Sequence, residues 1–250
     1  MKLSSKDIIL HNRGGSYHFR YLEWDSNFFK RPCYIFDVEN SHITKSDTLA
    51  IQIQNRLDGA FVTAKINSLY DYNFVQSLQK CGFIYIDTEV TLEFKEPPKA
   101  LEDNDAIEII KPDGKVDLPY DALGSEYSLT RFHTDPHISF KKADLIWVSY
   151  LKNFIIDDCH QMYVALIHGE VAGVVLVNIE KEQVMLFYVS VLSSFQNSGV
   201  GTKLIQKVVS NHKESRIRTG TQVKNVRALN FYIRNGFSKI FRTSTVMHRW

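Results

Sequence analysis

The alternation of hydrophobic and polar residues along the chain predicts a mixed α/β protein. Its clearest feature is an apolar run over 184–191, which is typical of a strand buried on both faces. Polar residues end this run, and apolar residues then recur at helical spacing at Val200, Leu204, Ile205, Val208 and Val209. The pattern therefore predicts a strand, a turn and an amphipathic helix in direct succession.

The same reasoning predicts elements on both sides of this unit. Upstream of residue 100 we expect extended structure over 16–38 with an aromatic capped turn at 22–29, helices over 47–57 and 71–80, and strands over 60–66 and 83–94. Downstream we expect a strand at 107–110, a helix over 143–154, a hairpin of strands 162–167 and 171–179, and, after the stretch 218–223, a helix over 225–235 that runs into a last strand. The hairpin and the 184–191 strand would form three consecutive antiparallel strands.

Composition narrows the class of protein but does not define a function. The chain has 250 residues, a formal net charge of +2 and 23% charged residues of both signs, which argues against non-specific nucleic-acid binding. Three scattered cysteines without C-x-x-C spacing predict reduced thiols rather than a disulfide framework or zinc site. With no signal peptide and no apolar run of membrane-spanning length, we expect a cytoplasmic protein.

Glycines mark the turn after the 184–191 strand. Gln196, Gly199 and Gly201 form a Q-x-x-G-x-G pattern immediately before the helix. A glycine turn at a helix N-terminus presents free backbone N–H groups and the positive end of the helix dipole, which together suit a phosphate. The glycines would let the backbone approach that anion closely, although a tight turn without any ligand gives the same pattern.

A second motif follows and makes the pattern specific. Asn225, Ala228, Tyr232 and Gly236-Phe237 follow the glycine turn in an order and spacing that resemble the Gcn5-related N-acetyltransferase (GNAT) family. The resemblance covers the C-terminal part of the chain from about residue 161. It implies a largely antiparallel twisted sheet with helices on both faces, acetyl-CoA as co-substrate and no metal.

The resemblance also assigns roles to residues. Backbone groups of Val189, Ser190 and Val191 would bind the pantetheine arm and the thioester. The pyrophosphate would lie on the turn, formed by Gln196, Asn197, Ser198, Gly199, Val200, Gly201 and Thr202. Asn225 would contact the cofactor through its side chain, and Tyr232 would act as the catalytic general acid, although a buried aromatic with no catalytic role is the alternative for Tyr232.

The first half of the chain repeats part of the second motif. The stretch 71–83 has the same frame as 225–237, with eleven residues from the first position to the glycine, but Leu78 replaces Tyr232 and no glycine turn precedes it. We therefore expect a partial, GNAT-like N-terminal domain over 1–98 and an acetyl-CoA-binding domain over 99–250, joined by the linker that begins at Glu96-Pro-Pro-Lys99. A chance similarity between two helix–glycine–strand units is the alternative.

Candidates for acceptor binding lie outside the motifs. Arg131, His133 and Asp135 belong to the densest titratable cluster, which we interpret as an acceptor-site loop or else a solvated loop. Glu23 and Trp24 belong to the aromatic turn and are weaker candidates for the same site. No residue stands out as the general base, and the cluster lacks the distant partner that a metal site would need.

A narrower resemblance covers most of the chain. The residues 22–29, the partial repeat and the stretch from Thr221 to Tyr232 are similar to the dTDP-4-amino-4,6-dideoxygalactose (dTDP-fucosamine) N-acetyltransferases of bacterial polysaccharide synthesis. This implies N-acetylation of a nucleotide-linked amino sugar. The alternatives are another small amine, a protein N-terminus, or an acetyl-CoA-binding module without turnover. The sequence leaves a homodimer open and gives no sign of a membrane or nucleic-acid partner.

Overall fold

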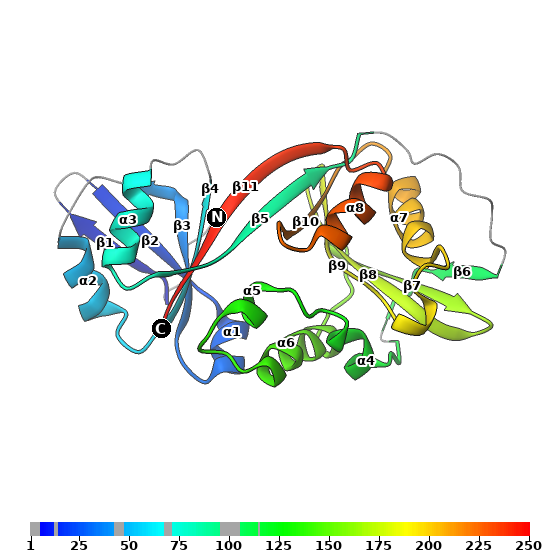
Figure 1. The fold of residues 1–250 in the computed structure, drawn as a ribbon, viewed down its shortest axis with the longest axis horizontal. Coiled ribbons are helices and arrows are strands. Elements are labelled where there is room, and N and C mark those ends of the chain that lie inside the picture. The colour runs from blue at the N-terminus through cyan, green and yellow to red at the C-terminus, as the bar shows by residue number, and fades with distance from the viewer. Residues whose placement is uncertain (1–5, 13–14, 43–47, 68–71, 96–105, 115) are drawn as a thin grey trace. The chain divides into compact units, whose positions relative to one another are not determined.

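The computed structural model describes residues 6–12, 15–42, 48–67, 72–95, 106–114 and 116–250 (Figure 1). Its helices are α1 (Glu23–Phe29), α2 (Thr48–Arg56), α3 (Tyr72–Lys80), α4 (Tyr120–Ser125), α5 (Arg131–Thr134), α6 (Phe140–Lys152), α7 (Val200–Asn211) and α8 (Val226–Arg234), with a 3₁₀ turn η1 (Ser193–Phe195). Its strands are β1 (Ile8–Asn12), β2 (Gly15–Tyr21), β3 (Cys33–His42), β4 (Phe61–Asn67), β5 (Ile84–Glu93), β6 (Ile107–Ile110), β7 (His160–Ile167), β8 (Glu170–Glu180), β9 (Gln183–Val191), β10 (Arg216–Gln222) and β11 (Lys239–Arg249).

The described strands form a mixed sheet, and the chain divides into two compact units. The hydrogen-bonded strand order is β1-β2-β3-β4-β11-β5-β10-β9-β8-β7-β6. Unit 1 comprises Met1–Glu89, Thr134–His137 and Arg242–Trp250, and unit 2 comprises Val90–His133 and Ile138–Phe241, so β5 and β11 contribute residues to both. The predicted mixed α/β fold class is confirmed. The predicted boundary between residues 98 and 99 lies outside the described residues and stays a prediction.

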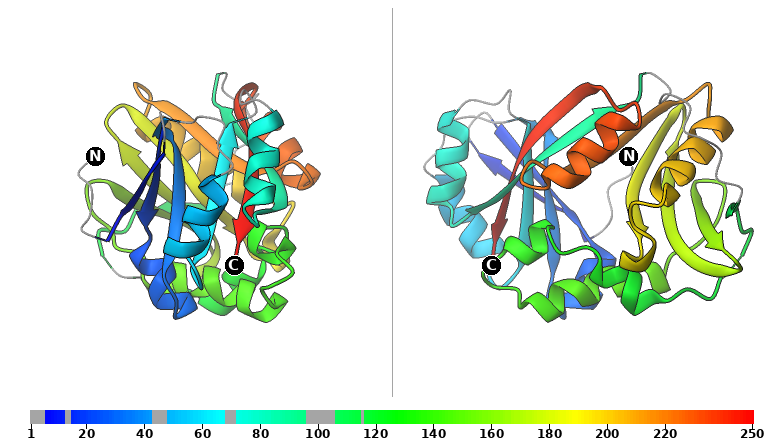
Figure 2. Two further views of the ribbon diagram at one scale, coloured as in Figure 1. Left: turned by 90° about the vertical axis from the view of Figure 1, so that its left-hand side faces the viewer. Right: turned by 45° about the vertical axis from the view of Figure 1, so that its right-hand side comes forward.

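Unit 1 packs two helices against one side of its strands (Figure 2). The pairs β1–β2, β2–β3 and β4–β11 are antiparallel, and β3–β4 is parallel. The core of this unit joins α2 and α3 to the strands. Its largest fully buried side chains are Tyr17, Phe19, Phe36, Ile53, Leu57, Ile66, Leu78 and Phe83. Ile53 and Leu57 are both buried because they are four residues apart and so lie on one helix face, as the sequence pattern predicts.

The repeated frame has the same backbone geometry in both units. In α3 the Phe83 N–H donates to Leu78 O (3.0 Å) and the Gly82 N–H donates to Gln79 O (2.9 Å). After α8 the corresponding bonds join Phe237 to Tyr232 (3.1 Å) and Gly236 to Ile233 (3.1 Å). Both glycines have positive φ, 85° and 91°, as a Schellman helix cap requires. Asp71, which the sequence aligns with Asn225, lies outside the described residues.

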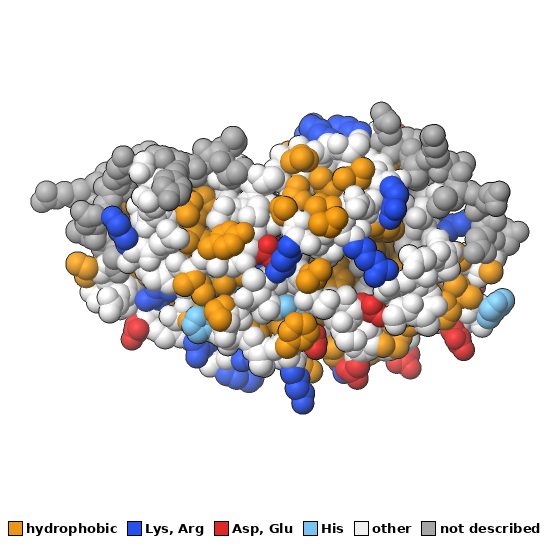
Figure 3. All heavy atoms as spheres, in the orientation of Figure 1, with side chains coloured by type: hydrophobic (Ala, Val, Ile, Leu, Met, Phe, Trp, Pro, Cys, Tyr) orange, Lys and Arg blue, Asp and Glu red, His pale blue; other side chains and the backbone are white. Residues whose placement is uncertain are grey.

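Unit 2 has a separate core on each face of its strands. Strands β7, β8 and β9 form consecutive antiparallel pairs, as predicted. Because successive side chains of a strand point to opposite faces, Tyr163 and Val175 pack with α7 and α8, while Val164 and Val174 pack on the side of α4 and α6. Helix α8 buries Tyr232 but leaves Val226 and Ile233 exposed, and Figure 3 shows hydrophobic side chains over this helix.

Two local predictions are wrong, and a third, that strand β9 is buried on both faces, is confirmed in part. Residues 23–29 form helix α1 rather than a capped turn, because the Ser26 N–H donates to Leu22 O (2.9 Å) and closes a helical turn. Strand β9 alternates buried and half-buried residues, but its buried residues lie on both faces, Val184 and Leu186 on the α7 side and Tyr188 and Ser190 on the α4 side. The 131–137 cluster contains helix α5, so it is not simply a solvated loop.

In the described part of the chain, no helix is long and apolar enough to cross a membrane.

Arg249, near the end of the chain, ties two helix ends of unit 1 together. Its Nη1 donates to Leu57 O (3.0 Å), just after α2, and its Nε donates to Cys81 O (3.1 Å), just after α3. The last carbonyls of a helix lack partners within the helix, and a cation also interacts favourably with the helix dipole there. The residue is buried, so these bonds are shielded from water.

We expect Arg249→Met to destabilise the protein by about 2–4 kcal/mol, because it leaves two buried helix-end carbonyls without donors. Urea denaturation followed by circular dichroism measures the change. Arg249→Lys is the matched control, since it keeps the charge and one donor, and it should cost less than Met. A loss below about 0.5 kcal/mol, the level of an ordinary surface substitution, would contradict the role of Arg249.

Unit 2 contains a nearly buried carboxylate surrounded by cations. Glu93 of β5 accepts from Arg218 Nε (3.0 Å) and Nη2 (2.9 Å) through Oε2, and its Oε1 contacts Lys95 Nζ (2.8 Å) and Lys239 Nζ (3.3 Å). The hydrogen bond from Lys95 lowers the pKa of Glu93 most. Burial opposes this effect, Arg218 and Lys239 add to it, and the pKa falls from 4.5 to about 2.

Because the folded-state pKa is depressed, the stabilisation from Glu93 is fully present above pH 4.5 and is lost as pH falls toward 2. A shift of this size corresponds to at most about 3 kcal/mol, less whatever solvent screening removes. We expect the wild type to lose more unfolding free energy than Glu93→Gln between pH 5 and pH 2, on the order of 1–3 kcal/mol. Parallel pH profiles for the two proteins in urea denaturation would refute the assignment.

Candidate functional site

The site begins where β9 separates from β10 in unit 2. These two strands are parallel neighbours from Arg216↔Gln183 to Thr219↔Leu186, and no pair beyond that position is found. On its other side β9 stays paired with β8 up to Val191. In that ladder Val177 pairs with Leu186 and Leu176 with Tyr188, so Phe187 is the extra residue of a β-bulge.

The bulge reverses which face each later side chain of β9 takes. Leu186 packs on the α7 side, whereas Tyr188, two residues on, packs on the α4 side. A β-bulge bends its strand and increases the local twist, which is the physical reason for the separation from β10. Backbone groups of Val189 to Val191 on that edge are therefore not used by the sheet. The sequence predicted these donors from the family resemblance but gave no sign of the bulge.

The glycine turn leads into α7 as predicted. Gly199 has φ 91° and precedes the first residue of α7, and Asn197 also has positive φ (64°). The first intrahelical bond joins Lys203 N–H to Gly199 O (3.0 Å), so the N–H groups of Val200, Gly201 and Thr202 start the helix without helical acceptors. Ser198 donates its hydroxyl to Phe195 O (2.6 Å), which fixes the turn. The arrangement suits an anion at this helix end.

Gly199 and Gly201 are required for different structural reasons. A Cβ at Gly199 would make only an ordinary contact, 3.9 Å from Ile107 Cδ1, so glycine is required there by its positive φ. Gly201 has ordinary helical backbone, but a Cβ there would lie 2.9 Å from Phe231 Cζ. Gly201 therefore lets α7 and α8 approach each other, a role that the phosphate argument from sequence did not include.

The Gln196 side chain connects three segments. Its Nε2 donates to Glu126 Oε2 (2.9 Å) and to Val191 O (2.9 Å), and its Oε1 accepts from Arg227 Nη2 (2.7 Å). Glu126 also accepts the Ser193 N–H through Oε1 (2.8 Å). Gln196 thus fixes the turn against β9 and α8, and it holds the cation of Arg227 beside the turn. Sequence reasoning missed Glu126, which lies outside both motifs, and Arg227, which lies within the second motif but is none of its defining residues.

Tyr232 lies where β9 and β10 separate. It is buried on α8 against Phe231 and Phe237, and its hydroxyl is hydrogen-bonded to the side chain of Thr219. Thr219 is the last β10 residue paired with β9, and its hydroxyl also donates to Leu186 O (3.1 Å). Burial raises the pKa of Tyr232 and the Thr219 bond only partly opposes this, so the phenol keeps its proton at neutral pH.

Asn225 has a clear structural role. It is the N-cap of α8, and its Oδ1 accepts the Ala228 N–H (3.1 Å). This bond satisfies one of the free donors at the start of the helix that carries Tyr232. A contact from the Asn225 side chain to a cofactor remains a prediction. The side-chain oxygen is used in the cap bond, so the side-chain nitrogen, Nδ2, is the atom left for such a contact.

Tyr127 is a residue of the site that sequence reasoning missed. Its hydroxyl accepts the Val189 N–H (2.8 Å), one of the backbone donors predicted to bind the thioester. Its ring stacks on Tyr188, with centroids 4.4 Å apart, and packs against Trp147 at 4.9 Å. Nothing in the spacing of the chain distinguishes Tyr127 from the other tyrosines, so only the folded structure brings it to β9.

Two of the predicted acceptor residues lie at α5 in unit 2. The His133 side chain is only 2% exposed, with Nδ1 at 2.8 Å from Thr130 Oγ1 and Nε2 at 2.9 Å from Asp144 Oδ1. The guanidinium of Arg131 lies 4.4 Å from the ring of Phe132. His133 is thus part of the packing that joins α5 to α6, and its contact with an acceptor stays a prediction.

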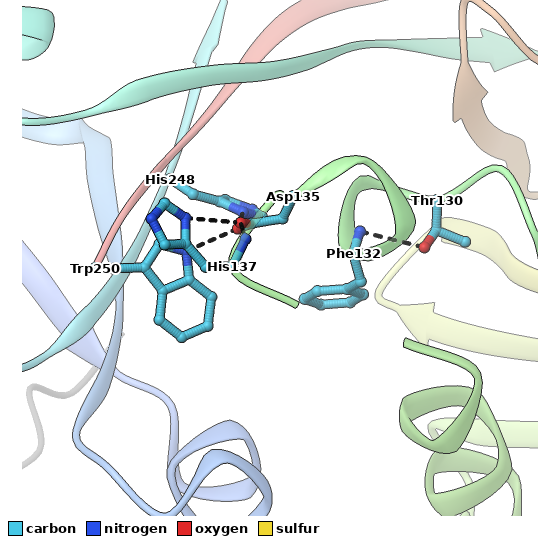
Figure 4. A network of polar contacts seen from close by, with 6 residues as sticks. All are labelled: Thr130, Phe132, Asp135, His137, His248 and Trp250. Carbon is cyan, nitrogen blue, oxygen red and sulfur yellow. Dashed lines mark hydrogen bonds and ion pairs between the residues drawn. The ribbon is translucent and has the colours of Figure 1, made fainter. Parts of the chain in front are cut away.

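The other predicted acceptor residues lie in unit 1. Asp135 Oδ2 accepts from His248 Nδ1 (2.6 Å) and Trp250 Nε1 (2.8 Å), and its Oδ1 accepts the His137 N–H (2.8 Å) (Figure 4). Burial raises the pKa of Asp135, but these bonds outweigh it and hold the pKa below its usual value. Both carboxylate oxygens are therefore already in use.

Glu23 and Trp24 lie on α1 of unit 1, and neither shares a described contact with Asp135. Glu23 is exposed and contacts Lys6 Nζ at 3.5 Å. The Trp24 ring stacks on Phe28 with centroids 5.4 Å apart. Their predicted role in acceptor binding stays a prediction. Among the described residues, no group of three His, Cys, Asp or Glu side chains could hold a metal ion.

Comparisons with known sequences agree with this geometry. The sequence profile of the acetyltransferase (GNAT) family matches residues 122–237, from α4 to the glycine cap after α8. The spore coat polysaccharide biosynthesis protein SpsD of Bacillus subtilis strain 168 is 27% identical over 115 residues. That match spans 45% of this chain and 40% of SpsD, so the chain spans well under half the length of this relative.

Solved structures resemble the fold over nearly the whole chain. A functionally unknown conserved protein from Staphylococcus epidermidis has a TM-score of 0.65 at 13% identity, covering 98% of this chain and 94% of that one. A GCN5-related N-acetyltransferase from Sphaerobacter thermophilus has a TM-score of 0.59 at 13% identity, covering 94% and 76%. A tandem GNAT protein from the clavulanic acid biosynthesis pathway has a TM-score of 0.58 at 13% identity, covering 94% and 78%. The chain therefore has the GNAT fold, and its residues 122–237 match the acetyltransferase (GNAT) family.

Proposed function

We propose that the protein transfers the acetyl group of acetyl-CoA to the amine of a nucleotide-linked amino-deoxy sugar, of the dTDP-4-amino-4,6-dideoxygalactose type. The observation that carries the transfer chemistry is the separation of β9 from β10 with the buried phenol of Tyr232 at its start. An open strand edge supplies backbone donors, and a protonated phenol beside it supplies an acid. These two groups are what acyl transfer from a thioester to an amine needs.

The cofactor would lie along the described residues of unit 2. The N–H groups of Val200, Gly201 and Thr202 would hold the pyrophosphate, with Arg227 adding a positive charge beside the turn. The edge of β9 that β10 leaves open, from Val189 through Ser190 to Val191, would bind the pantetheine arm, with the Val189 N–H already donating to the Tyr127 hydroxyl (2.8 Å). Bound acetyl-CoA supplies the acetyl group as an activated thioester.

The transfer itself needs one proton delivered and one removed. The amine attacks as the free base, and Tyr232 gives its proton to the sulfur as the carbon–sulfur bond breaks. The proton that the nitrogen releases returns to Tyr232 through solvent, so the enzyme is restored. The raised pKa of Tyr232 suits this role because the phenol is fully protonated at neutral pH.

The acceptor class is supported by two weaker observations. One is the sequence resemblance over 22–29 and the partial repeat, and the other is the similarity to SpsD, whose name places that protein in polysaccharide biosynthesis. Both are compatible with an amino sugar. Arg131, His133, Asp135, Glu23 and Trp24 are retained as candidates for acceptor binding, of which Asp135 and His133 would act by fixing their loop rather than by direct contact.

Thiol release from acetyl-CoA in the presence of dTDP-4-amino-4,6-dideoxygalactose, spermidine or a small peptide tests the function. We expect turnover with the nucleotide sugar and a fall in kcat of about 10²–10⁴-fold in Tyr232→Phe with unchanged acetyl-CoA affinity. Tyr163→Phe, which also removes a buried hydroxyl, is the matched control and should retain activity. Turnover only with spermidine or the peptide would show that the acceptor is another amine and not the nucleotide sugar. Acetyl-CoA binding without any turnover would indicate a non-catalytic module.

The two glycines give a prediction about the turn. Gly199→Ala should weaken acetyl-CoA binding, because alanine at φ 91° costs roughly 1 kcal/mol and shifts the turn. Gly201→Ala should destabilise the fold by about 1–3 kcal/mol through its clash with Phe231, and Phe231→Leu should restore part of that loss. Calorimetry of acetyl-CoA binding and urea denaturation separate the two effects. Additive losses in the Gly201→Ala, Phe231→Leu double variant would contradict the contact.

A further inference from the structure

Tyr127 has a hydroxyl proton with no described acceptor. Its oxygen accepts the Val189 N–H at 2.8 Å, and in the described part of the chain no hydrogen bond has the Tyr127 hydroxyl as donor. A hydroxyl can accept and donate at the same time, and one that already accepts a hydrogen bond is polarised toward donating. The proton of Tyr127 is therefore available to a group outside the protein.

The position of this hydroxyl is fixed from several sides. The Tyr127 ring stacks on Tyr188 at 4.4 Å with an interplanar angle of 13°, and it packs on Trp147 at 4.9 Å. Tyr188 is held in turn by its own hydroxyl, which donates to Leu123 O (2.7 Å). The preceding residue, Glu126, is bound to Ser193 and Gln196. A donor held in this way needs little reorganisation when a ligand arrives.

Tyr127 is also close to the other tyrosine of the site. Val189 comes three residues after Leu186, at which the β9–β10 pairing ends, and Tyr232 is bonded to Thr219, the partner of Leu186. Tyr127 and Tyr232 interact electrostatically, and burial raises the pKa of Tyr127 well above its ordinary value. Both phenols are therefore neutral donors at the place where the thioester would lie.

We propose that Tyr127 is a second catalytic tyrosine, whose hydroxyl donates to the carbonyl oxygen of the bound thioester. This inference rests on the proposed function. Val189 N–H then acts through Tyr127 rather than on the thioester directly, and the hydroxyl stabilises the negative charge that develops on the carbonyl oxygen. No proton leaves Tyr127. The amine forms the new bond to carbon, the carbon–sulfur bond breaks, and Tyr232 protonates the sulfur.

Two alternative roles of the Tyr127 hydroxyl make predictions that differ from those of our proposal. If the Tyr127–Val189 bond is only structural, its loss changes stability but not recognition of a carbonyl group. If the thioester displaces Tyr127 from Val189, removing the hydroxyl frees that N–H and acetyl-CoA binds more tightly. Our proposal alone predicts that binding loses its preference for a carbonyl when the hydroxyl is removed.

Calorimetry with acetyl-CoA and S-ethyl-CoA separates these readings without an acceptor. The two compounds differ in the carbonyl oxygen, so their affinity ratio reports the groups that bind it. We expect the wild type to favour acetyl-CoA by up to about tenfold, the value of one hydrogen bond, and Tyr127→Phe to bind both equally. In the presence of an acceptor that the wild type acetylates, kcat of Tyr127→Phe should fall by about 10²–10³-fold relative to the wild type.

Tyr163→Phe is the matched control. It removes the hydroxyl of a buried tyrosine of unit 2 that lies outside this ring stack and bonds Gln161 Oε1 (3.0 Å), and it should keep the wild-type preference for acetyl-CoA. An unchanged ratio in Tyr127→Phe, tighter acetyl-CoA binding by that variant, or no preference in the wild type would each overturn the role of Tyr127. If the wild type binds neither compound, the proposed function itself fails.

Discussion

The β-bulge at Phe187 is the feature on which the rest of the site depends. One extra residue in β9 ends its pairing with β10 after Thr219↔Leu186, while pairing with β8 continues to Val191. A strand edge inside a sheet is thereby left open, at a place that a regular ladder would close. The same bulge moves Tyr188 to the opposite face from Leu186, which creates the stacking surface for Tyr127.

Around this opening, side chains stabilise the backbone, and the backbone is left to bind the ligand. Gln196 fixes the glycine turn, Asn225 caps α8, and Gly201 permits close packing on Phe231. Each of these residues belongs to a recognisable motif, yet in the structure each has a protein partner. The groups left to meet the ligand are main-chain N–H groups and the phenols of Tyr127 and Tyr232, which bond Val189 and Thr219 before a ligand is bound. None of these groups carries a formal charge, so none needs a counter-ion.

The buried charges serve the framework rather than the site. Glu93 with its three cations lies among β5, β10 and β11 in unit 2, and Asp135 with His248 and Arg249 with two helix ends lie in unit 1. A buried charge is tolerated only with partners of good geometry, so removing one partner costs more than the pair gains. The position of β11, which supplies Lys239, His248 and Arg249, is fixed by such contacts in each unit.

The sequence by itself determined the fold class, the order of elements around the glycine turn and the resemblance to the GNAT family, because hydrophobic periodicity and glycine positions act locally along the chain. It also identified the repeated helix cap, since Gly82 and Gly236 are required by backbone conformation alone. Only the tertiary structure decided that Phe187 is a bulge, that Gly201 meets Phe231, and that Tyr127 contacts Val189. These depend on pairing and packing between residues distant in sequence, for which spacing along the chain carries no signal.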